Sequence, residues 1–164
     1  MEWLVSLFVV FVLLVSLFAG FKEGAVRHSF NLVALFITIY IAGVSYHLLA
    51  GLLSFLPGDN WENFIGFIIT FAIINVVFHF AFFLPRRIIQ KLWKRGLLYR
   101  LLGGALNAAD ASIGLVVFAL VLHAFPIFDW LERWVAGSGV LSSLVHIFGF
   151  IQAMLPAEFQ PAGI

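Results

Sequence analysis

The sequence predicts an all-α membrane protein with four transmembrane helices. Of its 164 residues, 63% are hydrophobic and 10% are charged, and the mean hydropathy is +1.11. Soluble domains do not reach this composition. Four apolar runs are each long enough for a bilayer crossing, which needs about 20 residues. No stretch between them could form a soluble domain, so we expect a single membrane domain over residues 1–164.

The first predicted span covers residues 3–21 and has the length of a signal peptide. Its charges do not fit that role, because Glu2 precedes the apolar run while Lys22 and Arg27 follow it. A cleavage site of small residues is also lacking. We therefore expect this helix to be retained.

The second predicted span, residues 29–56, would reach about 40 Å at roughly 1.5 Å per residue. It should be tilted, bent or partly outside the hydrocarbon, with Gly43 and Gly51 as candidate bends. A Pro-Gly-Asp-Asn turn at 57–60 separates it from the third span, residues 63–84, which we expect Pro85 to end.

A basic segment follows the third span. In residues 86–98, apolar residues at three- and four-residue spacing alternate with cations, which predicts an amphipathic helix on the membrane surface, bound to anionic headgroups. A nucleic-acid partner is the weaker alternative, because a basic link between two spans needs none. The predicted lipid-surface residues are Arg86, Arg87, Lys91, Lys94, Arg95 and Arg100.

The fourth predicted span, residues 101–125, carries small or polar residues at helical spacing. They would line one face, on which another helix can approach closely. The predicted packing face consists of Gly103, Asn107, Ala111 and Gly114.

The C-terminal region contains a shorter apolar run, residues 140–155. Sixteen helical residues reach about 24 Å, which is short for a crossing. We expect an amphipathic or half-inserted helix, with a fifth crossing as the alternative. The tail, residues 156–164, shows no pattern of regular structure.

The loop charges predict the orientation. Lys and Arg are concentrated in loops 22–28 and 86–100, whereas the charged residues in the turn at 57–62 are all acidic. The positive-inside rule therefore places both basic loops in the cytoplasm, with the N-terminus and the C-terminal region outside.

Asp110 is the acidic side chain that the sequence places deepest in a span. From the positions of the residues in their spans, Asn107 of the same helix and Asn75 and His79 of the third span lie at a similar depth. If the two helices are neighbours, the four residues form one buried polar cluster. Such a cluster could hold helices together, pair across a subunit interface, or bind a proton between Asp110 and His79.

Little points to catalysis or to a cofactor. The chain has no cysteine, and no two histidines show metal-ligand spacing. Ser142 and Ser143 near His146 lack an acid to orient the histidine. We expect no metal, no cofactor and no enzymatic activity.

Two stretches resemble the colicin V production protein (CvpA) family. They are GFKEGAVRHSFNLVALF, residues 20–36, and YRLLGGALNAADASIGLVV, residues 99–117. Tyr99, Asn107, Asp110 and Ala111 depart from the family pattern. The resemblance implies a bacterial inner-membrane protein associated with toxin production or secretion and with the cell envelope.

Two hypotheses follow. In the first, the protein is a nonenzymatic scaffold or accessory subunit in toxin production, secretion or envelope homeostasis. It would form a homo-oligomer or bind other membrane proteins through the packing face. In the second, it is a small oligomeric proton- or ion-coupled transporter or channel that uses Asp110.

Overall fold

The computed structural model describes residues 2–55, 58–92 and 96–159, and all regular structure in those residues is helical. Four helices are long and apolar enough to cross a membrane, which confirms the predicted class. Their bounds are α1 (Glu2–Glu23), α2 (Ala25–Ala50), α3 (Asp59–Ala81) and α5 (Leu97–Ala124). Helix α2 begins earlier than predicted and runs through Gly43 without a break; a short 3-10 helix, η1 (Gly51–Leu53), follows it.

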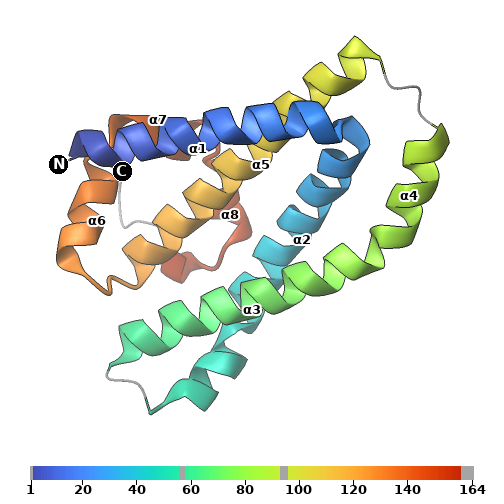
Figure 1. Cartoon of the computed structure of the whole chain (residues 1–164). Helices are drawn as coiled ribbons and strands as arrows, with labels where there is room; N and C mark the ends of the chain where they lie inside the picture. The colour runs from blue at the N-terminus through green and yellow to red at the C-terminus, as the bar shows by residue number, and fades with distance from the viewer. Residues whose placement is uncertain (1, 56–57, 93–95, 160–164) are drawn as a thin grey trace.

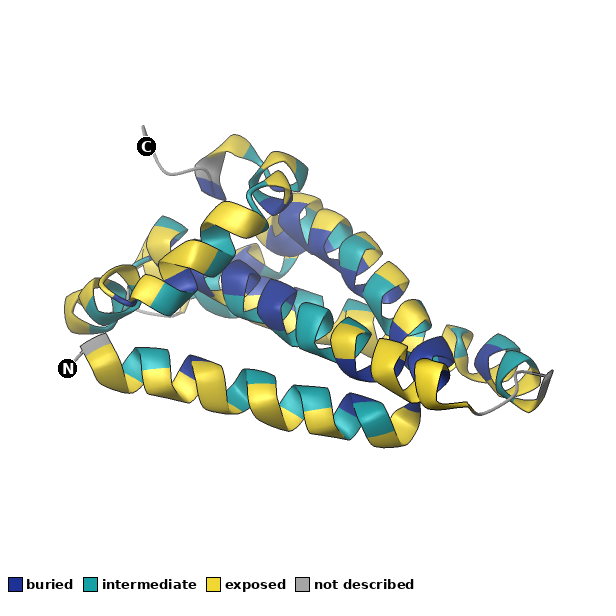
Figure 2. Ribbon diagram, turned by 90° about the horizontal axis from the view of Figure 1, so that it is seen from above, coloured by how far each residue is buried: buried dark blue, intermediate teal, exposed yellow. Residues whose placement is uncertain are grey.

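The long helices pack in two antiparallel pairs. Helix α1 lies along α5, and α3 lies along α2, while α2 also contacts α5 and joins the pairs (Figure 1). The third span therefore packs mainly on the second rather than on the fourth. Most of α1 is exposed, whereas the buried residues concentrate on α2 and α5 (Figure 2). An apolar helix with this exposure suits a lipid environment.

Helices α1 and α5 approach closely because glycines face each other. A Cβ atom on Gly103 would lie 2.5 Å from the carbonyl oxygen of Gly20 and 2.7 Å from Cα of Gly24. Gly24, between α1 and α2, has a φ of 86°, which residues with a side chain rarely adopt, and the ring of Tyr99 occupies the place of its missing side chain. This glycine contact sets the spacing of the first and last spans.

The core at the opposite end of the bundle is aromatic. The ring of Tyr46 on α2 is fully buried and lies 5.5–6.2 Å, between ring centroids, from those of Phe67, Phe125 and Phe159. Phe159 belongs to a 3-10 helix, η2 (Ala157–Phe159). The expectation that the tail lacks structure is therefore wrong for these residues, because burial of an aromatic side chain holds them in the core; residues 160–164 lie outside the described part.

The C-terminal region contains three short helices: α6 (Asp129–Ala136), α7 (Gly139–Ile147) and α8 (Phe150–Met154). The prediction of one helix over 140–155 is wrong, because the chain breaks at Phe148 and Gly149. Nine residues of α7 reach about 14 Å, too short to cross a bilayer. Ser138 caps α7 through its hydroxyl, which accepts from the backbone N–H of Leu141 at 3.4 Å.

The basic segment forms α4 (Phe83–Leu92), which begins three residues earlier than the predicted helix. Pro85 lies in its first turn, where a missing N–H costs nothing, and its ring ends α3 at Ala81. Leu97 and Leu98, which we expected in the surface helix, begin α5 instead. Residues 93–95 lie outside the described part. That α4 lies on the membrane surface stays a prediction.

The glycine contact predicts a position-dependent effect of alanine. Gly103→Ala should lower the free energy of unfolding by about 1–3 kcal/mol, because the new methyl group meets backbone atoms of α1 that cannot move aside. Thermal unfolding of the purified protein in detergent measures this. Gly114→Ala on the same helix is the control: nothing lies within 4 Å of its Cβ position, so it should be neutral or slightly stabilising. Equal midpoints for the two variants would contradict the proposed role of this contact.

Candidate functional site

A polar cavity of about 270 Å³ lies between α2, α3 and α5. The four residues that we predicted as an intramembrane cluster, Asp110, Asn107, Asn75 and His79, all line it. The other residues of its wall are Asn31, Ala34, Leu35, Phe71, Arg86, Ala111 and Gly114. Charged and amide side chains from four helices therefore face one space within a bundle whose surface is otherwise mostly apolar.

The cluster is not fully enclosed. Asn75 and His79 on α3 are exposed, whereas Asn107 and Asp110 on α5 are half-buried. The reason is the packing of α3, which follows α2 and makes few direct contacts with α5. The expected burial of all four residues is thus wrong for the two on α3.

The Asp110 carboxylate lies on the wall of the cavity. Among the described residues, no hydrogen bond or ion pair reaches it, and no direct bond joins it to His79. A carboxylate within a membrane span is expensive unless water, a partner or a proton satisfies it. The cavity provides the space for such a partner.

Asn107 performs a structural task that the sequence did not reveal. Its side-chain amide donates to the backbone carbonyl of Ser16 on α1 at 2.6 Å. The predicted packing face is therefore divided: Gly103 contacts α1 of the same chain, Ala111 and Gly114 line the cavity, and Asn107 does both. The end of the face at Gly103 is not available to a second copy, because α1 already covers it.

We predicted that Arg86 faces lipid, but the structure places its side chain in the interior. Its side chain is only 8% exposed, and one guanidinium N–H donates to Oδ1 of Asn31 on α2 at 3.0 Å. The expectation of a lipid-surface role is wrong for Arg86, because its side chain is buried against α2 by the bond to Asn31. Arg86 instead contributes a cation to the cavity wall.

An ionic cluster adjoins Arg86 where α1 passes into α2. Glu23 contacts Arg27 at 2.8 Å and the buried His28 at 3.2 Å. Burial lowers the pKa of Arg86, and the positive charge of Arg27 lowers that pKa further, while Glu23 acts in the opposite direction. We did not identify this cluster from the sequence. The four-residue spacing of Glu23 and Arg27 was the available signal.

Three of the other predicted lipid-surface residues are exposed. Arg87, Lys91 and Arg100 are exposed, and the Arg87 guanidinium stacks 4.3 Å from the centre of the Phe83 ring. Lys94 and Arg95 lie outside the described residues. Contact with anionic lipid stays a prediction for all of them.

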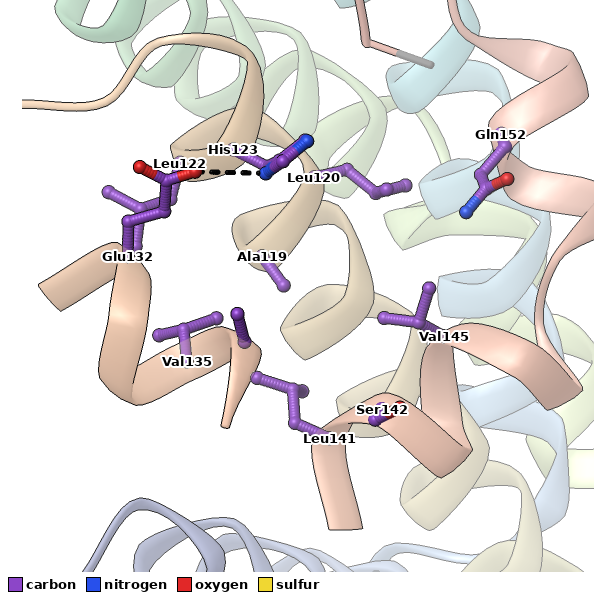
Figure 3. A pocket seen from close by; sticks show the side chains of 11 residues that line it. Ala119, Leu120, Leu122, His123, Glu132, Val135, Leu141, Ser142, Val145 and Gln152 are labelled. Atoms are coloured by element: carbon purple, nitrogen blue, oxygen red, sulfur yellow. Dashed lines mark hydrogen bonds and ion pairs between the residues drawn. The ribbon is translucent and has the colours of Figure 1, made fainter. Parts of the chain in front are cut away.

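A second cavity of about 190 Å³ lies between the end of α5 and helices α6 to α8 (Figure 3). Aliphatic side chains such as Leu120, Leu141 and Val145 form most of its wall. Figure 3 shows Glu132 of α6 directed at His123 of α5, with 3.0 Å between Oε1 and Nδ1. This pair joins α6 to the end of the fourth span.

Neither cavity contains a catalytic arrangement that we can identify. In residues 2–55, 58–92 and 96–159, no three His, Asp or Glu side chains are placed to hold a metal ion. The hydroxyl of Ser143 donates to the backbone carbonyl of Gly139 at 2.8 Å, a bond within its own helix.

The fold and the cavity define a class, a small helical multi-pass membrane protein with a polar site between its spans. A comparison with protein-family models then identifies the family. The model described as Colicin V production protein matches residues 5–155, and the chain belongs to that family. Searches of curated proteins and of solved structures find no match.

The bond of Asn107 predicts that this residue stabilises the bundle. Asn107→Ala should lower the free energy of unfolding by about 0.6–2 kcal/mol, since an interhelical hydrogen bond is lost. Asn75→Ala is the matched control, because Asn75 lines the same cavity, is exposed and makes no hydrogen bond among the described residues. Thermal unfolding in detergent compares the two, and an equal loss for both would argue against the Asn107 bond as the cause.

Proposed function

We propose that the protein is a nonenzymatic scaffold or accessory subunit of the bacterial inner membrane, serving toxin production, secretion or envelope homeostasis. Membership of the Colicin V production protein family supports the biological setting. Both basic segments, 22–28 and 86–100, would face the cytoplasm. The protein would act by binding a second copy or another membrane protein.

The observation that carries this proposal is the open side of the cavity. Helix α3 presents the exposed side chains of Asn75 and His79 at a depth where its other exposed residues, including Val76 and Phe80, are apolar. Polar groups facing lipid are costly, and in membrane proteins they face a partner or water. A helix from a partner, seated between α3 and α5, would cover these groups and complete the wall.

This proposal places the contact differently from the sequence-based hypothesis. The Gly103 end of the predicted face is covered by α1, whereas the surface of α3 next to the cavity is open. Ala72 lies one turn before Asn75 and is exposed on that helix. A substitution at Ala72 therefore probes the proposed contact and leaves the polar residues of α3 unchanged.

Cysteine cross-linking tests the contact, because the chain has no cysteine of its own. In native membranes, Ala72→Cys should form a cross-linked product with a second copy or with another membrane protein. Phe11→Cys, on the exposed face of α1, is the control and should give little product. Equal yields at the two positions would show that α3 is not a preferred contact.

A second candidate function, proton- or ion-coupled transport, is favoured by Asp110. Its carboxylate faces the cavity from the middle of the fourth span, without a bonded partner among the described residues. Intramembrane carboxylates of this kind serve as proton-binding groups in transporters. A bundle of four spans encloses little space, so transport would require an oligomer that completes the cavity.

Reconstitution in liposomes distinguishes the two functions. If the protein transports protons, Asp110→Asn should reduce the pH-driven proton flux to the level of empty liposomes while the oligomeric state is retained. If it is a scaffold, neither the wild type nor the Asp110→Asn variant conducts protons. Loss of assembly in the variant would instead place Asp110 at a subunit contact.

A further inference from the structure

We propose that Arg86 is the centre of a binding site for a singly charged oxyanion, a phosphodiester or phosphate group. This inference goes beyond the proposed function and holds for a scaffold as well as for a transporter. It rests on the burial of Arg86 without a contacting carboxylate among the described residues, on the hydrogen-bonding capacity that its guanidinium leaves unused, and on the cavity beside it.

In the described part of the chain, no carboxylate contacts the guanidinium of Arg86. The neighbouring acid, Glu23, already contacts Arg27 at 2.8 Å and His28 at 3.2 Å. No ion pair reaches Arg86 among the described residues. The Glu23 carboxylate is thus engaged by Arg27 rather than by Arg86, and a buried charge without a contacting counter-ion is destabilising.

The guanidinium of Arg86 also retains unused donors. One of its terminal nitrogens donates to Asn31, but its Nε is buried and makes no hydrogen bond with any described residue. A guanidinium carries five N–H groups in a planar fork, which matches the oxygens of a phosphate or a carboxylate. The neutral Oδ1 of Asn31 orients this fork but supplies no charge.

The cavity offers room for the missing anion. Arg86 lines it together with the amide of Asn31 and the ring of His79, both of which can donate to an oxyanion. Asn107 also lines the cavity, but its amide nitrogen already donates to Ser16. Asp110 lies on the same wall and repels negative charge, which favours a singly charged group over a doubly charged one. No ion pair joins Asp110 to Arg86 among the described residues, so Asp110 does not serve as a contacting counter-ion for this arginine.

Two sources could supply such a group. The headgroup of an anionic phospholipid carries a singly charged phosphodiester, and Arg86 lies at the end of the bundle that holds the basic segments. Inorganic phosphate could enter from solution. The chemistry at the guanidinium is the same for both.

Binding can be measured on the full-length protein in dodecyl maltoside, a detergent without phosphate. Inorganic phosphate and short-chain dihexanoyl phosphatidylglycerol are the two probes, and sodium chloride at equal ionic strength is the baseline. The readout is the midpoint temperature of thermal unfolding, measured by tryptophan fluorescence. This midpoint rises when a ligand binds the native state. If only phosphate raises the midpoint, the ligand is a soluble phosphate ion. If only the lipid raises it, the ligand is a phospholipid headgroup. A wild-type protein that responds to neither probe overturns the proposal.

Three variants locate the site. Arg86→Gln should weaken the apparent affinity at least about tenfold, since a charged bidentate partner is lost. Arg87→Gln is the matched control, because Arg87 is the next residue on α4 and is exposed, and it should respond as the wild type does. An undiminished response of Arg86→Gln overturns the proposal.

Asn31→Asp keeps the test valid even if Arg86→Gln does not fold. The new carboxylate would lie at the position of Oδ1, 3.0 Å from the guanidinium, and would serve as the internal counter-ion. This variant should have a higher midpoint than the wild type without ligand and should lose the response to either probe. If it keeps the full response, the anion does not bind at Arg86.

Discussion

The close approach of α1 to α5 is the constraint on which the rest of the bundle depends. Gly20 and Gly103 bring the two backbones together, and Gly24 allows the chain to turn directly from α1 into α2 while Tyr99 fills the space beside it. Because α2 starts immediately after this turn, its position against α5 follows from the same contact. In lipid, where apolar surfaces gain little by meeting each other, such backbone proximity and interhelical hydrogen bonds are what hold helices together.

The polar cavity follows from this arrangement. Helix α2 packs on α5 along one side and on α3 along the other, which leaves α3 and α5 apart where Asn75, His79 and Asp110 lie. The amide of Asn107 is used for α1, while Asp110, less than one turn further along α5, faces the cavity. Polar residues close together in the sequence thus have different tasks, one in stability and one in the candidate site.

The charges at the basic end are divided in a similar way. Arg87 is exposed and stacks on Phe83, whereas Arg86 is buried against α2. Successive residues of an α-helix point about 100° apart, so Arg86 and Arg87 lie on different sides of α4. One basic segment therefore carries both an exposed cation, Arg87, and a buried one, Arg86.

The sequence by itself determined the helical class and the four apolar spans, because each span must satisfy its own backbone and carry about 20 apolar residues. It also singled out four of the polar residues that line the cavity. It also located Gly103, the small residue of α5 at which α1 packs closely. Only the tertiary structure decided which helix meets that face, that α7 and α8 are separate, that Phe159 joins the core, and that Arg86 points inward. These features depend on contacts between residues far apart in the chain, and hydropathy and spacing, which are local properties, carry no information about such contacts.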